Sequence, residues 1–126
     1  MIDRRSEDGF TLIELMVTIL IIAVLAAIAI PVFMKQREKG WRAQTQTALK
    51  NTAVAEEAFI VDHGSYTGDI DSLIDEQGLR FASDVDVAIP LADAGVRYCV
   101  EAQHPSLGET WHYASAAGTP TQGACS

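Results

Sequence analysis

The stretch from Phe10 to Met34, FTLIELMVTILIIAVLAAIAIPVFM, decides how the rest of the chain is interpreted. Its 25 residues include a single charged side chain, Glu14. A helix that crosses the hydrocarbon layer of a membrane needs about 20 apolar residues, and the run from Leu15 to Met34 supplies them without a charge. The sequence therefore predicts a transmembrane helix that begins close to the N-terminus.

The remainder, residues 35–126 of the 126-residue chain, is small and acidic. Acidic and basic side chains cancel through Val61, so the whole formal net charge of -8 lies after that residue. Such a surface repels phosphate, which argues against nucleic-acid binding by the C-terminal part. The remainder is also too small for a sizeable enzyme core, and the sequence has no recognisable catalytic motif. We therefore expect no enzymatic activity, no cofactor and no bound metal.

Three interpretations of the apolar stretch compete: a removed secretory signal peptide, a plain signal anchor, and a segment that is cut at its front and kept. A signal peptide has an apolar region of roughly 7 to 15 residues and a small-x-small cleavage site. Ala27-Ile28-Ala29 fits such a site, but the apolar run is longer and Glu14 interrupts it. Glu14 has two interpretations. It lies only about 6 Å of helix rise after Phe10, which is compatible with a position at the edge of the membrane. Ionisable residues deeper in a membrane, in contrast, usually mark a function.

The residues Gly9-Phe10-Thr11-Leu12-Ile13-Glu14-Leu15 resemble the leader junction of type IV prepilins and the related pseudopilins. The resemblance implies that a membrane peptidase cuts between Gly9 and Phe10 and methylates the new amino group of Phe10. Residues 1–9 would be the leader, and residues 10–34 the half of a long helical spine that lies first in the membrane and then in the filament core. The chain would be a pilin, a structural subunit of a helical cell-surface filament used for adhesion, motility or DNA uptake.

Assembly would depend on Phe10 and Glu14. Cleavage creates an ammonium group on Phe10, and the resemblance implies that the Glu14 carboxylate of a neighbouring subunit pairs with it and sets the axial stagger. Pro31 matches a proline that pilins often carry, and it is expected to kink the spine helix because it removes a hydrogen bond. Prolines are also tolerated in membrane helices without a special role.

The implied partners are further copies of the chain in a helical homopolymer, minor pilins, the prepilin peptidase, an assembly machinery with a cytoplasmic motor, and the membrane before assembly. The resemblance places the head outside the cytoplasm, whereas a count of the basic residues on each side of the span predicts the opposite orientation. Two alternatives remain: a pseudopilin of a type II secretion or competence system, and a monomeric membrane-anchored extracellular binding module.

Residues 35–62 are predicted to be the amphipathic half of the spine, so the whole helix would run from Phe10 to Asp62. Apolar and small side chains recur there at spacings of three and four, as in a helix with one buried face. This stripe, which would dock the head, comprises Trp41, Thr45, Ala48, Thr52, Ala55 and Phe59. Glu56 and Glu57 are expected to be solvated.

Residues 63–126 are predicted to form a small head with an antiparallel sheet, which gives an α+β, pilin-like fold. Asp69 or Asp71 would cap a short helix that ends before Gly78. Alternating polar and apolar residues predict strands at 84–89, ended by Pro90, at 96–100 and around 111–113. The segment after Gly118 is small and polar, and no strand is predicted there.

Cys99 and Cys125 are the only cysteines. In an exported head they are expected to form a disulfide and close a loop of about 26 residues, which stabilises by roughly 3 to 4 kcal/mol on the chain-entropy model. The alternative is a zinc site with His104 and His112, although the spacings match no compact zinc motif. Otherwise the histidines, His63 included, are expected on the surface or in strands.

Overall fold

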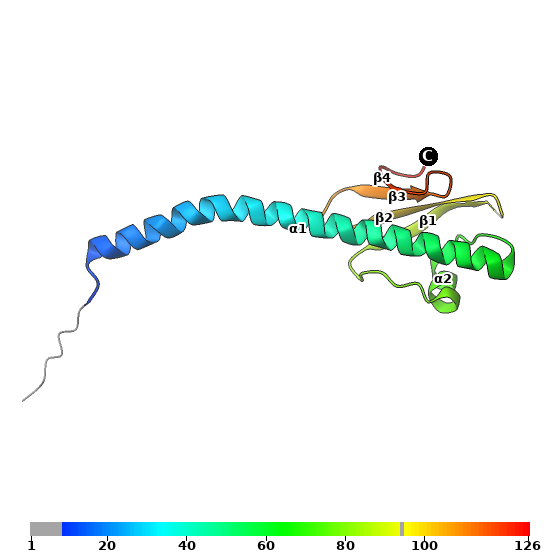
Figure 1. The fold of residues 1–126 in the computed structure, drawn as a ribbon, viewed down its shortest axis with the longest axis horizontal. Coiled ribbons are helices and arrows are strands. Elements are labelled where there is room, and N and C mark those ends of the chain that lie inside the picture. Colours follow the sequence, from blue (N-terminus) through cyan, green and yellow to red (C-terminus); the bar gives the residue numbers. More distant parts are fainter. Residues whose placement is uncertain (1–8, 94) are drawn as a thin grey trace, which may run out of the picture. The chain divides into compact units, whose positions relative to one another are not determined.

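The computed structural model describes residues 9–93 and 95–126. Helix α1 spans Leu12–His63 and α2 spans Ile70–Gln77. Four strands follow, β1 at Asp86–Asp93, β2 at Arg97–Gln103, β3 at Thr110–Ala114 and β4 at Pro120–Gln122 (Figure 1). Internal contacts divide the chain within α1 into an N-terminal unit, which ends at Arg37, and a C-terminal unit, which runs from Glu38 to Ser126. The predicted leader lies outside the described residues apart from Gly9.

Helix α1 is 52 residues long and confirms the predicted spine to within two residues at either end. It is continuous across Pro31. Its N-terminal part is long and apolar enough to cross a membrane, and the rest of the chain buries none of this apolar stretch. The fold is α+β, as predicted: one long helix followed by a small antiparallel sheet.

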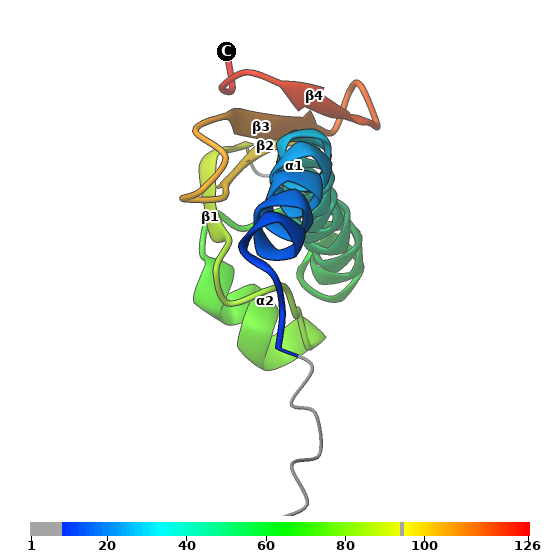
Figure 2. The ribbon, with the colours of Figure 1, turned by 90° about the vertical axis from the view of Figure 1, so that its left-hand side faces the viewer.

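In the C-terminal unit the sheet has the strand order β1-β2-β3-β4, and every pair of neighbours is antiparallel. Figures 1 and 2 show the sheet beside the C-terminal part of α1, with α2 next to β1. The main core cluster lies between α1 and β2. Its buried members are Ala48, Leu49, Ala53, Val85, Tyr98, Val100 and Ala102.

Helix α2 has the predicted termini. Asp69 caps it, because its side chain accepts a hydrogen bond from the Asp71 N–H at 3.1 Å. The Ser72 hydroxyl donates to the same carboxylate at 2.7 Å, and these two hydrogen bonds lower the pKa of Asp69. Gly78 stops the helix in the left-handed conformation, at φ 68°, which glycine adopts without strain.

The first strand corrects one prediction, because Pro90 does not end it. Strand β1 begins at Asp86 and continues through the proline to Asp93. The pairing register with β2 shifts between Ala88 and Leu91. Proline has no N–H to donate to a neighbouring strand. Strand β1 tolerates Pro90 because it lies at the edge of the sheet and because Pro90 falls at the irregularity, where its N–H is not needed for pairing with β2.

The segment after Gly118, which the sequence marks only as small and polar, contains strand β4. This strand pairs with β3, with Trp111 opposite Gln122 and Tyr113 opposite Pro120. Three residues are too few to show a two-residue period, so the pattern could not reveal the strand.

Candidate assembly site

The start of α1 is organised by Thr11 and Glu14. The Thr11 N–H donates to Glu14 Oε2 at 3.2 Å, and the Glu14 N–H donates to Thr11 Oγ1 at 3.1 Å. This reciprocal arrangement is a capping box, which satisfies two backbone N–H groups that a helix terminus otherwise leaves unpaired. It explains why the helix begins at Leu12. Because a carboxylate can accept about four hydrogen bonds, Glu14 retains acceptor capacity for a cation.

Gly9 and Phe10 lie just before this cap and outside the helix. The Phe10 side chain is 89% exposed, and a Cβ built on Gly9 would meet no atom within 4 Å. The peptide between the two residues therefore lies in open, non-helical backbone.

The N-terminal unit has large apolar side chains on every side of its helix. The exposed large apolar residues in α1 up to Met34 are Leu12, Ile13, Leu15, Met16, Val17, Ile19, Leu20, Ile21, Ile22, Val24, Leu25, Ile28, Ile30, Val32, Phe33 and Met34. Contiguous apolar surface of this extent marks a site of membrane or protein interaction, because its exposure to water is unfavourable and monomeric soluble proteins rarely have it. This half of α1 needs either lipid or other apolar helices around it.

The second half of α1 buries one face against the rest of the C-terminal unit. Ala48, Ala55 and Phe59 are buried, while Trp41 is half-buried. Thr45 and Thr52 are also buried, and their hydroxyls donate to the carbonyl oxygens of the residues four positions earlier, at 2.9 and 2.8 Å. Both hydroxyls are thereby satisfied, which makes them compatible with an apolar core.

An ion pair joins α1 to the sheet near the start of the C-terminal unit. Arg42 Nη2 and Nε donate to the two oxygens of Glu109 at 2.9 and 3.3 Å. Trp111 Nε1 also donates to Glu109, at 3.0 Å. The pKa of Glu109 is lowered, first by the Arg42 hydrogen bond and then by the Trp111 bond, while the pKa of Arg42 is raised. The Glu109 carboxylate therefore keeps its charge to a lower pH than an unpaired glutamate does.

His104 follows β2 and is 4% exposed, whereas the sequence indicated a surface or strand position. Its ring stacks on Trp41 with 5.4 Å between the centroids. The Ser106 N–H donates to Nδ1 of His104 at 3.1 Å, so the imidazole is packed and partly satisfied. No periodic signal marks this position, because it lies in a connection and not in a regular element.

Glu56 corrects the prediction for the acidic pair on the spine. Glu57 is exposed, as expected, but Glu56 is completely buried. Glu56 Oε2 accepts a hydrogen bond from the Thr67 N–H at 3.0 Å. Thr45, Thr52 and Glu56 follow one another at spacings of seven and four residues, which place all three on one face of the helix, and this spacing was the signal that could have found it.

The predicted disulfide between Cys99 and Cys125 is present, with 6.1 Å between the Cα atoms. The zinc alternative is wrong, because both sulfur atoms are bonded to each other, and no cluster of three or more potential ligands occurs among the described residues. Two backbone N–H groups also hold the C-terminal segment: Cys125 N–H donates to Glu101 Oε1 at 2.7 Å, and Gly123 N–H donates to the Thr110 carbonyl at 2.8 Å.

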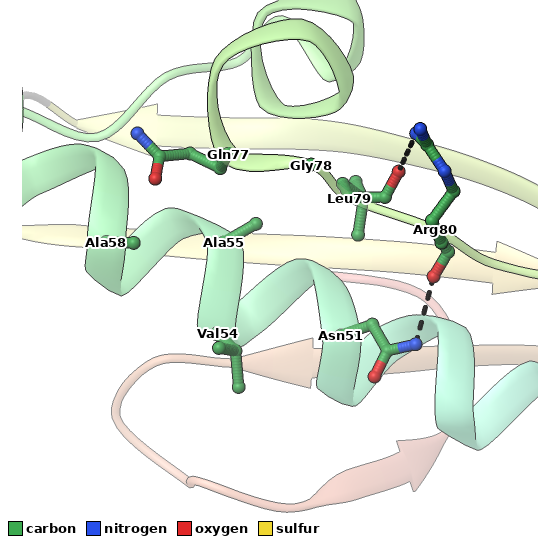
Figure 3. A pocket seen from close by; sticks show the side chains of 8 residues that line it. All are labelled: Asn51, Val54, Ala55, Ala58, Gln77, Gly78, Leu79 and Arg80. Carbon is green, nitrogen blue, oxygen red and sulfur yellow. Dashed lines mark hydrogen bonds between the residues drawn. The ribbon is translucent and has the colours of Figure 1, made fainter.

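A groove of about 290 Å³ lies between α1 and residues 77–80, at the end of α2 and just after it, and Figure 3 shows its lining. Asn51 Nδ2 donates to the Arg80 carbonyl at 2.9 Å and ties the two sides together. The lining contains no His, Cys or acidic side chain, so the groove offers neither a nucleophile nor a general base. It comprises Asn51, Val54, Ala55, Ala58, Gln77, Gly78, Leu79 and Arg80.

Comparison with known proteins bears on both parts of the chain. Residues 4–30 match the family described as the prokaryotic N-terminal methylation motif. The chain is also similar to the type IV wide pilus major component PilA4 of Thermus thermophilus, with 34% identity over 120 residues that cover 94% of this chain and 86% of the relative. That alignment includes the head as well as the spine. The chain belongs to the type IV pilin family.

Two further relatives place this pilin within the wider group. The type IV major pilin protein PilA of Myxococcus xanthus is 34% identical over 102 residues, which cover 79% of this pilin and 46% of the relative. The type II secretion system core protein G of Pseudomonas aeruginosa is 33% identical over 63 residues, which cover 50% of this pilin and 44% of the relative. These relatives are structural pilins and pseudopilins, not enzymes.

Proposed function

We propose that this pilin is a structural subunit that is stored in the membrane as a precursor and polymerises into a helical type IV pilus at the cell surface. The observation that carries the proposal is the similarity to PilA4, because it extends over 94% of the chain and includes the head. The exposed apolar half of α1 supports it, since this surface requires lipid before assembly and neighbouring helices afterwards. One repeated head-to-tail contact that does not close would generate the fibre.

A prepilin peptidase would cut between Gly9 and Phe10 and methylate Phe10. The open backbone at these two residues supports this step, because a protease must bind its substrate as an accessible, non-helical strand. Residues 1–8, the rest of the proposed leader, lie outside the described residues.

The new ammonium group of Phe10 would pair with Glu14 of a neighbouring subunit. Each oxygen of a carboxylate accepts more than one hydrogen bond, so the bond from the Thr11 N–H leaves Glu14 able to bind the ammonium group. Breaking a buried ion pair by removing one partner costs roughly 3 to 5 kcal/mol, which is enough to select one axial register over others. Pro31 would bend the helix within this apolar half.

The head would lie outside the cytoplasm. The disulfide supports this orientation, because disulfides form and persist in oxidising compartments. The basic residues that follow the span, beginning with Lys35, oppose it by the positive-inside rule. A subunit that is later extracted from the bilayer can use these charges in the filament instead.

The proposed partners are further copies of the chain, minor pilins, the prepilin peptidase and an assembly machinery with a cytoplasmic motor. A pseudopilin of a type II secretion or competence system is the second candidate, favoured by the similarity to core protein G. That similarity covers half of this chain, whereas the similarity to PilA4 covers nearly all of it. A monomeric membrane-anchored binding module is the third candidate.

Replacement of Glu14 tests the function. In cells that lack their own copy, Glu14→Ala should leave cleavage after Gly9 intact and reduce sheared surface filaments at least about tenfold, as expected for loss of several kcal/mol per contact. Glu38→Ala is the matched control, because Glu38 is an exposed carboxylate on the same helix, outside the apolar stretch, and it should leave filament yield unchanged.

Other outcomes separate the candidates. Wild-type cells that yield no long filament but contain cross-linked multimers would favour the pseudopilin. Wild-type protein that forms no multimers would favour the binding module. Normal filaments from Glu14→Ala would remove the proposed role of that carboxylate.

A further inference from the structure

Glu56 is exceptional within the C-terminal unit because its carboxyl group is completely buried. Glutamate is almost never fully buried unless it is paired with a cation, since burial removes the hydration of its charge. The described residues place no lysine, arginine or histidine in an ion pair with it. The carboxyl group therefore requires another explanation.

The two oxygens of Glu56 have different environments. Oε2 accepts from the Thr67 N–H at 3.0 Å. Oε1 is buried and has no hydrogen-bond partner among the described residues. An unpaired buried oxygen is costly, and the cost is larger when that oxygen carries negative charge.

Glu56 holds the connection between α1 and α2, residues 64–69. The hydrogen bond between Glu56 and Thr67 is followed by a second one within the connection, in which the Asp69 N–H donates to Thr67 Oγ1 at 3.1 Å. Asp69 in turn caps α2 through the Asp71 N–H. Glu56 is thus linked through two residues of the connection to the first turn of α2.

Among the residues that the structure describes, the ionisable groups that act on Glu56 add no positive charge. Glu57 is its neighbour on α1. Tyr66 in the connection donates to Glu57 at 3.3 Å, and the buried Tyr98 of β2 donates to the Ala53 carbonyl at 3.4 Å. Burial raises the pKa of Glu56, Glu57 raises it further, and the Thr67 N–H opposes them.

We propose that Glu56 is a proton-dependent latch, in which the neutral carboxyl group holds the 64–69 connection against α1 and the ionised group releases it. The neutral form keeps a carbonyl-type oxygen for the Thr67 N–H and leaves only an uncharged hydroxyl unpaired. Ionisation places a negative charge on the unpaired, buried side, and release of the connection lets water reach it.

The direction of the pH dependence follows from proton linkage. The closed connection binds the Glu56 proton more tightly than the open connection, where the carboxyl group has an ordinary pKa of about 4.3. Below that pH, Glu56 makes its full contribution to the stability of the closed connection. This contribution is lost as the pH rises through the raised pKa of Glu56 in the closed form. In that window each unit of pH multiplies the opening constant by up to about ten.

Hydrogen exchange measured by mass spectrometry on the full processed chain in detergent micelles tests the latch. After correction for intrinsic exchange, a peptide that covers residues 64–69 should lose protection as the pH rises from about 5 to 8.5, by up to about tenfold per pH unit within the transition. A peptide from β2, residues 97–103, should change much less, because it belongs to the core.

Two variants at neighbouring positions identify the group responsible. Glu56→Gln keeps the side-chain shape and an oxygen for the Thr67 N–H but cannot ionise, so it should abolish the pH dependence and protect residues 64–69 at high pH. Glu57→Gln removes the same charge from the exposed neighbour and should keep the pH dependence, with the transition moved to lower pH because Glu57 no longer raises the pKa of Glu56. A pH profile unchanged in Glu56→Gln, or a connection less protected in that variant at every pH, would overturn the proposal.

A measurement on the unmodified protein covers the case in which Glu56→Gln does not fold. With glutamate labelled by ¹³C at the side-chain carboxyl, the Glu56 resonance of the wild-type chain should titrate above the ordinary glutamate pKa of about 4.3. Titration of Glu56 at or below that ordinary value would contradict the latch.

Discussion

The two halves of α1 share one helical backbone and differ in what their side chains require. Before Met34 no large apolar side chain is buried, whereas between Thr45 and Phe59 a regular stripe is buried. The first half is apolar on every side, so its own chain cannot cover it. The second half is apolar on one face, and the sheet and α2 cover that face. A single helix therefore serves two purposes, assembly with other molecules and support of its own head.

The largest expected effect is a difference in unfolding free energy between two leucine-to-alanine variants, one in each half of α1. Leu49→Ala, at a completely buried site, should lower the free energy of unfolding of the C-terminal unit by about 2 to 5 kcal/mol through lost burial and a cavity. Leu20→Ala, at a site that is 63% exposed, should leave that free energy unchanged. Denaturant unfolding followed by tryptophan fluorescence, on full-length chain in detergent, gives both values.

Leu20→Ala should instead act on assembly, because Leu20 belongs to the surface that needs other molecules. Equal losses of unfolding free energy in the two variants would break the contrast between the halves of α1.

The disulfide should have a somewhat smaller effect, confined to the head. Replacing both cysteines by serine removes a cross-link between residues 26 apart in sequence, and the free energy of unfolding should fall by roughly 3 to 4 kcal/mol. Strand β4 should stay paired, because the Glu101 and Thr110 contacts of the C-terminal segment remain. Hydrogen exchange of residues 120–122 checks the pairing, and reduced wild-type protein should behave like the double variant.

The N-terminal half was the easier part to predict from the sequence. A long apolar run with one charge, preceded by Gly9 and Phe10, needs no tertiary information to be recognised, and the spine helix follows from its periodicity. The caps of α2 were also predictable, because Asp69 and Gly78 act on backbone groups within a few residues.

The parts that were not predicted depend on contacts between distant residues. Helical spacing alone places Glu56 on the buried face of α1, but its hydrogen-bond partner, the Thr67 N–H, comes from the next connection and could not be predicted. Strand β1 passes through Pro90 because β2 pairs on both sides of the irregularity. Strand β4 exists because β3 provides the partner for three otherwise featureless residues.

The most direct test of the central claim is the intact mass and N-terminal sequence of the protein recovered from sheared cell-surface material. The account predicts a chain that starts at Phe10, heavier by one methyl group and lighter by the two hydrogens of the Cys99–Cys125 bond. A chain that starts at Met1 and is confined to membranes would contradict the account, as would a secreted chain that starts near Ile30.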